Sequence, residues 1–69
     1  MKVSNLKKGK VYRYQSSAEN VDVMYTGTHF CPKVGWGYGF KGYNEDTGKY
    51  DGYFNTLGQK TVENQISEL

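Results

Sequence analysis

The feature that most constrains the fold is a run of three aromatic residues that alternate with three glycines near the middle of the chain. They lie in the stretch Val-Gly-Trp-Gly-Tyr-Gly-Phe-Lys-Gly-Tyr, which runs from Val34 to Tyr43. Successive side chains of a strand point to opposite faces, so Trp36, Tyr38 and Phe40 share one face and the glycines leave the other nearly bare. Glycine packs no side chain and weakens a strand. We therefore expect the sharp coiling of a small barrel, or a surface on which another backbone or a flat ligand lies.

The length of the chain limits it to one domain. With 69 residues, we predict a single domain over residues 1–69. A domain of this size buries only about 60% of the surface of its unfolded chain, so each large side chain matters. The seven tyrosines supply much of the apolar area, which allows a core without a disulfide or a metal. Cys31 is the one cysteine, and we expect no metal site and no cofactor.

The charge is unevenly distributed, although the net charge is only +2. The first fifteen residues carry five cations and no acid: Lys2, Lys7, Lys8, Lys10 and Arg13. Lysines of this kind are typical of a solvated strand edge that deters unwanted sheet pairing. The alternative is a basic patch for an anionic partner.

The amino-terminal residues Met-Lys-Val-Ser are not followed by an apolar run. We expect neither a signal peptide nor a membrane span, no membrane partner, and a cytoplasmic location.

Two strands are predicted in the first part of the chain. Lys10–Gln15 alternates in polarity, and we expect Tyr12 and Tyr14 to point inward and Arg13 to point outward. A polar connection follows, and Val21–Thr26 is the second strand. We expect this strand to end at a connector that runs from residue 27 to residue 32, because a proline cannot lie in a central strand.

The aromatic-glycine strand continues this pattern into a hairpin. Tyr43 is out of phase with the earlier rings, which indicates a bulge near Gly42. Asn44–Gly48 has the residues of a turn, and Lys49–Asn55 is the fourth strand. In that strand we expect Tyr53 to face away from the core, opposite its neighbours at positions 50 and 54.

The carboxyl-terminal segment is predicted to be a helix. Val62, Ile66 and Leu69 have the i, i+4, i+7 spacing of one helical face. Gly58 is the expected N-cap, and Leu57 forms a hydrophobic staple with Val62. A final strand is the alternative, but it would bury an asparagine amide that needs hydrogen-bond partners. The predicted fold is mainly β: a small SH3-like or OB-like barrel of four to five antiparallel strands with a short C-terminal helix.

Three segments carry a resemblance to known proteins. Leu6-x-x-Gly9-x-x-Tyr12, the strand Val-Met-Tyr-Thr-Gly from position 23 and Val62-Glu-Asn-Gln-Ile66 lie along most of the chain. This set resembles the small, mostly uncharacterised SH3-like barrel proteins of bacteria and their phages. The resemblance implies the fold and almost nothing about activity.

A second resemblance concerns the aromatic strand alone. Gly-Tyr-Gly-Phe from position 37, followed by Tyr43, resembles the strand motif of RNA-recognition and cold-shock domains, in which rings stack on bases. Trp36 replaces the basic first residue of that motif and Lys41 replaces an aliphatic one. The segment before Trp36 also lacks room for the helix of an RNA-recognition domain.

Residues that could support catalysis or metal binding have simpler explanations. His29 and Cys31 have no third orienting group near them in the sequence. Asn44, Asp46 and Asp51 lack the glutamate that closes a calcium loop. We therefore expect structural roles for these residues, and a protein that is not an enzyme.

Three functions remain, and all depend on the aromatic side chains. The main hypothesis is a non-catalytic protein–protein interaction module, an adaptor, regulator or inhibitor, that docks a partner or a second copy of itself. The alternative is single-stranded nucleic-acid binding by base stacking, with the N-terminal lysines on phosphates. The third is capture of a small flat ligand such as a nucleotide. The candidate partner-binding residues are Arg13, Trp36, Tyr38, Lys41, Tyr43 and Tyr53.

Overall fold

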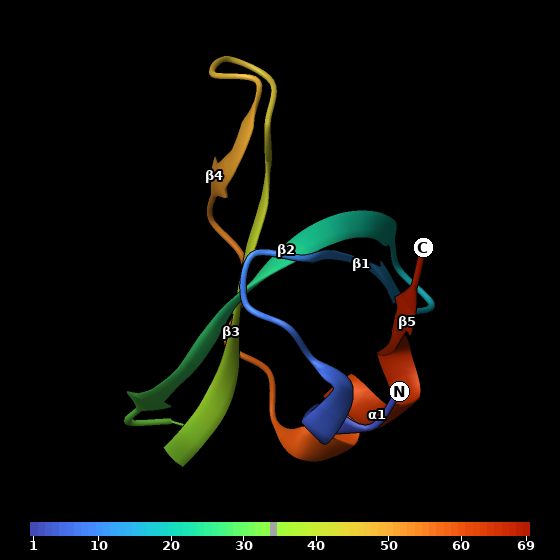
Figure 1. Ribbon diagram of the computed structural model, residues 1–69, viewed down its shortest axis with the longest axis vertical. Helices are drawn as coiled ribbons and strands as arrows, with labels where there is room; N and C mark the ends of the chain where they lie inside the picture. The colour runs from blue at the N-terminus through green and yellow to red at the C-terminus, as the bar shows by residue number, and fades with distance from the viewer. Residues whose placement is uncertain (34) are drawn as a thin grey trace.

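Five antiparallel strands form one sheet in the computed structural model, which describes residues 1–33 and 35–69 (Figure 1). The elements in chain order are η1 (Val3–Asn5), β1 (Val11–Gln15), β2 (Asn20–Cys31), β3 (Gly35–Asn44), β4 (Lys49–Gly52), α1 (Gln59–Gln65) and β5 (Ile66–Glu68). The strands lie in the order β4-β3-β2-β1-β5. The mainly β fold with a short helix is confirmed. Over the described residues β4 and β5 remain at the two edges of the sheet, so the predicted barrel closure is not confirmed.

The core lies on one face of the sheet, where α1 and the segment before it cover the strands. Its buried members are Tyr12, Val23, Tyr25, Phe40, Leu57, Val62 and Ile66. Strand alternation places Tyr12 of β1 opposite Val23 of β2, and Tyr25 opposite Phe40 of β3. The inward orientation predicted for Tyr12 and Tyr14 is confirmed, since Tyr12 is fully buried and Tyr14 packs against the core.

β2 is twice as long as the sequence pattern predicts. It continues past Gly27 through Phe30 to Cys31, which lies opposite Gly35 of β3. The prediction of a connector over residues 27–32 is wrong for most of its length. Gly27, with φ of +112°, lies where the register with β3 shifts, so this glycine forms an irregularity inside the strand instead of ending it.

The hairpin of β3 and β4 follows the sequence prediction closely. The first residue of the predicted strand, Val34, lies outside the described residues. The register with β4 shifts between Gly42 and Asn44, as the bulge prediction requires. In the predicted turn, Gly48 has φ of +70° and its N–H donates to the Asn44 carbonyl at 2.8 Å. β4 itself ends at Gly52, three residues before the predicted end.

After β4 the chain leaves the edge of β3 and meets it again at Leu57, which forms an isolated antiparallel bridge with Tyr38. Leu57 and Tyr38 exchange two backbone hydrogen bonds of 2.8 and 2.9 Å. A Cβ atom on Gly37 would lie 2.5 Å from Cγ2 of Thr56 and 3.1 Å from the Leu57 carbonyl oxygen. The bare face that the alternating glycines predict is therefore covered by side chains of neighbouring segments, Thr56 beside Gly37 and His29 beside Gly39.

The C-terminal segment begins as predicted and ends differently. Gly58 is the N-cap of α1, and Leu57 and Val62 are both buried beside it, as in a hydrophobic staple. The helix stops at Gln65, and Ile66 pairs with Tyr14 of β1 as the first residue of β5. The prediction of a helix reaching the last residue is wrong, because pairing satisfies the backbone groups of the otherwise open edge of β1.

Two hairpins project from this packed part of the chain. In Figure 1 the β3–β4 hairpin rises to the top of the view, and the far ends of β2 and β3 extend to the lower left. The ends of both hairpins lie away from α1 (Figure 1). Among the described residues, no helix has the length and apolarity needed to cross a bilayer.

Candidate binding site

The predicted aromatic face of β3 is covered in its middle and open at one end. Phe40 is 4% exposed and packs on Tyr25 with ring centroids 5.4 Å apart. Trp36, four residues earlier on the same face, is 74% exposed. Its ring meets Phe30 of β2 edge-on at 5.9 Å. We call Phe30 and Trp36 the terminal aromatic pair.

Tyr38 does not join this exposed surface. Its side chain is half-buried, and its ring centroid lies 6.4 Å from that of Tyr25. Tyr43, the other predicted stacking residue, is seven positions from Trp36, which is about 23 Å along an extended strand. The stacking platform expected from Trp36, Tyr38 and Tyr43 is therefore not one surface.

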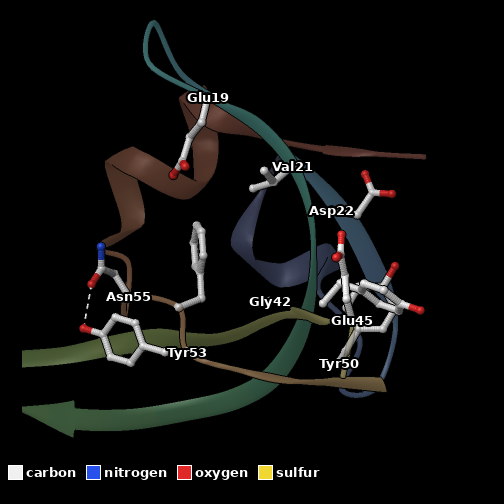
Figure 2. Close-up of a pocket in the computed structure, with 10 residues that line it drawn as sticks. Glu19, Val21, Asp22, Gly42, Glu45, Tyr50, Tyr53 and Asn55 are labelled. Carbon is white, nitrogen blue, oxygen red and sulfur yellow. Dashed lines mark hydrogen bonds between the residues drawn. The ribbon is translucent and has the colours of Figure 1, made fainter. Parts of the chain in front are cut away.

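Tyr43 and Tyr53 both line a cavity towards the opposite end of β3, and Figure 2 shows the residues around it. Its volume is about 660 Å³. The residues that line it are Glu19, Val21, Asp22, Gly42, Tyr43, Glu45, Tyr50, Tyr53, Phe54 and Asn55. The lining residues come from β2 and the connection before it, the β3–β4 hairpin and the segment after β4. We call this cavity the acidic-aromatic cavity.

Four rings form the apolar part of the acidic-aromatic cavity. Tyr43 and Tyr50 meet edge-on with centroids 5.2 Å apart across the β3–β4 hairpin. Phe54 is held by a similar edge contact with Tyr14, at 5.1 Å. Tyr53 is 88% exposed, and its hydroxyl donates to Oδ1 of Asn55 at 2.9 Å (Figure 2). The rings are thus fixed by neighbours on one side and open on the other.

Three carboxylates form the polar part of the same cavity. Figure 2 shows Glu19 on one side of Val21, and Asp22 with Glu45 on the other. Nε of Arg13 donates to Oδ1 of Asp22 at 2.6 Å, so the charge of Asp22 is compensated. Among the described residues, neither Glu19 nor Glu45 forms a salt bridge.

The two cationic residues predicted for the site do not lie together. Arg13 projects from β1, as predicted, but it is paired with Asp22 and does not line the cavity. Lys41 is exposed on the glycine face of β3 and lines a second cavity of about 520 Å³, to which Tyr53 also contributes. Four of the six predicted residues are thus divided among three places: Trp36 in the terminal aromatic pair, and Tyr43, Tyr53 and Lys41 in the two cavities. Tyr38 and Arg13 line neither cavity.

His29 and Cys31 lie on the glycine face of the β2–β3 ladder. His29 is paired with Gly37 and Cys31 with Gly35. The His29 ring nitrogen Nε2 shares a hydrogen bond with the hydroxyl of Thr56. Within residues 1–33 and 35–69, no group of three or more His, Cys, Asp or Glu side chains is arranged to hold a metal ion.

No family model, curated protein or solved structure matches this chain. The candidate function is therefore argued from the geometry of the described residues.

Several residues of the acidic-aromatic cavity were not predicted to be part of a site. The strand alternation predicts that Tyr50 and Phe54 are core residues, and the sequence holds no other signal for these two positions. Glu19 and Glu45 lie in connections and read as solvated turn residues. No signal in the sequence assigns these two acids to one cavity, because only the folded chain places both in the same lining. Phe30 was missed because the end of β2 was placed too early.

Proposed function

We propose that this protein is a non-catalytic binding module that docks another protein through the aromatic rings at the two ends of β3. The observation that carries the proposal is the exposure of four large rings: Phe30, Trp36, Tyr43 and Tyr53. A chain of 69 residues needs most of its rings in the core. Three of the four exposed rings are fixed by edge contacts, and exposed aromatic rings are the side chains that dominate binding energy in protein interfaces.

The charges of the acidic-aromatic cavity favour a protein partner over a nucleic acid at that end of β3. Of the N-terminal cations, Lys10 is paired with Glu68 at 3.3 Å and Arg13 with Asp22 at 2.6 Å. Phosphates approaching the acidic-aromatic cavity would meet Glu19 and the other carboxylates. Nucleic-acid binding and nucleotide capture stay as predictions that the experiments below distinguish.

The expected relationship to SH3-like barrel proteins is part of this proposal. It is supported by β5 lying beside β1, which brings the first and last strands of the chain into contact. A cytoplasmic location and closure into a barrel likewise stay predictions.

The proposal is tested by recovering a partner from extract of the protein's own host and then measuring direct binding with purified components. Two double variants are compared. Phe30→Ala with Trp36→Ala removes the terminal aromatic pair, and Tyr43→Ala with Tyr53→Ala removes the exposed rings of the acidic-aromatic cavity. Leu69→Ala is the matched control, because Leu69 is an exposed apolar residue next to β5 on the other edge of the sheet. Circular dichroism shows whether each variant keeps its fold.

We expect at least one double variant to weaken direct binding by about tenfold or more, since interface aromatic residues contribute that much. The Leu69→Ala control should bind as the parent does. Light scattering reports whether the partner is a second copy of the chain. Unchanged affinity in both double variants contradicts the proposal, as does recovered material that nuclease destroys.

A further inference from the structure

We infer that the acidic-aromatic cavity receives a positively charged side chain, lysine or arginine, from the docked protein. This inference rests on the proposed function and names the chemistry of the partner at one of the two ends of β3. Three properties of the cavity carry it: its rings, its charge and its size.

The rings of the cavity have the geometry of a cation-binding wall. Tyr43 and Tyr50 are held edge-to-face, with an angle of 67° between their planes, and both line the cavity. Tyr53 and Phe54 complete the lining, and the face of Tyr53 is open to solvent. An ammonium or guanidinium group within about 6 Å of a ring face is attracted by the negative potential of that face.

The charge of the cavity is opposite to that of the whole protein. The net charge of the chain is +2, yet no described residue of the lining is a lysine or an arginine. Asp22 is compensated by Arg13 at 2.6 Å. Glu19 and Glu45 are both exposed, and their charges are available to a ligand. A cationic group is therefore favoured over a neutral or anionic one of the same size.

The size of the cavity suits a side chain and its neighbours in a peptide. Pockets for small ligands span about 300–1,000 Å³, and this cavity, at about 660 Å³, lies within that range. The apolar stem of a lysine or arginine side chain can lie along the rings while its charged end reaches a carboxylate. Glu19 and Glu45 stand on different sides of Val21, so the cationic group can be reached from either side (Figure 2).

The inference is tested by NMR titration of the ¹⁵N-labelled protein with capped tripeptides. The probes are acetyl-Gly-Lys-Gly-amide and acetyl-Gly-Arg-Gly-amide, and the controls replace the central residue by norleucine or glutamate. We expect the cationic probes to shift the amide signals of Gly42, Tyr50 and Tyr53, and the shifts to diminish as salt is added. Binding of the norleucine probe as strong as that of the lysine probe overturns the inference. So does the absence of any shift at the highest soluble probe concentration.

Charge-neutral variants identify the groups responsible. Glu19→Gln together with Glu45→Gln keeps the shape of the two side chains and removes their charge, and we expect at least fivefold weaker binding of the cationic probes, an effect of about 1 kcal/mol for two exposed charges. Glu63→Gln is the matched control, because Glu63 is an exposed glutamate on α1 outside the cavity. Equal binding by parent and double variant overturns the inference.

The failure of this inference is distinguishable from failure of the proposed function. If removal of the two glutamate charges leaves partner binding unchanged while Phe30→Ala with Trp36→Ala weakens it, the cation site is wrong and the docking function stands. If the cationic probes bind but neither aromatic double variant weakens partner binding, the docking function is wrong.

Discussion

The middle of β3 and its two ends carry the same kinds of residue, but the rings in the middle are buried by other segments and the rings at the ends are exposed. In the middle, Phe40 packs against Tyr25, and the side chain of Thr56 covers Gly37 on the other face. At one end, Trp36 has Phe30 as its aromatic neighbour and is otherwise largely exposed. The comparison teaches that alternation fixes the face on which a ring lies, while the path of distant segments decides whether the ring becomes core or surface.

The two ends also differ from each other in charge. The acidic-aromatic cavity has Glu19 and Glu45 beside its rings. The second cavity, on the glycine face towards the other end, is lined by Lys33 and Lys41. We therefore expect the two ends to contact chemically different parts of a partner.

The largest expected effect separates the middle of the strand from its open end. Phe40→Ala should lower the free energy of unfolding by about 3–5 kcal/mol, because it leaves a cavity in the core. Trp36→Ala should cost about 1 kcal/mol or less, because the indole is mostly in water. Denaturant unfolding followed by circular dichroism measures both. Phe40→Leu serves if the alanine variant does not fold, and equal losses from Phe40→Leu and Trp36→Ala would contradict the comparison.

A smaller effect is expected on the glycine face. Gly37→Ala should destabilise the fold by about 1–3 kcal/mol, because the added methyl group would be too close to the Thr56 side chain and the Leu57 carbonyl. Gly42→Ala is the control: a Cβ there would be 3.4 Å from the Tyr53 carbonyl oxygen, an ordinary contact, and the change should stay within about 0.5 kcal/mol. Denaturation midpoints of the two variants provide the test. Similar midpoints would mean that Leu57 does not lie tightly on Gly37.

The covered middle should also be sensitive to alkaline pH. Burial raises the pKa of Tyr25 above its ordinary value of 10.0, with further contributions from Tyr38 and Tyr12. Above pH 10 the unfolded chain loses this proton more readily than the folded one, so stability is fully present below pH 10 and falls as the pH rises. Tyr25→Phe removes the ionisable group and should reduce the alkaline loss of stability, measured by thermal unfolding. A Tyr25→Phe variant with the same alkaline slope as the parent would contradict this assignment.

The smallest expected effect concerns the acidic end. The side chains of Arg13 and Asp22 are 39% and 37% exposed, so removing their ion pair should cost only about 0.2–1 kcal/mol of stability. Arg13→Gln should at the same time free the charge of Asp22 and strengthen binding of the lysine tripeptide. The same NMR titration measures this change. Weaker binding in Arg13→Gln would mean that the arginine itself contacts the ligand.

The local elements were largely predictable from the sequence. The turn at Asn44–Gly48, the bulge near Gly42 and the N-cap at Gly58 follow from backbone preferences of a few adjacent residues, and the structure has all three. The exposure of Tyr43 and Tyr53 was also predictable, because both were out of phase with the core.

Features that depend on distant segments were not predictable in the same way. β2 continues through Gly27 because β3 supplies a partner for it. Ile66 leaves the helical pattern because β1 offers an open edge. The acidic-aromatic cavity needs Glu19 and Tyr50 on the same wall, and residues 31 positions apart carry no shared local signal.

The central claim is that the rings at the ends of β3 form the docking surface while the rings in its middle form the core. Trp36 is the one tryptophan in the chain, so its fluorescence reports on one end directly. In the free protein we expect the emission of a water-exposed indole that acrylamide quenches readily. Saturating amounts of the purified partner should shift this emission to the blue and protect it from quenching. Emission that is already blue and protected in the free protein, or that the partner leaves unchanged, would contradict the account.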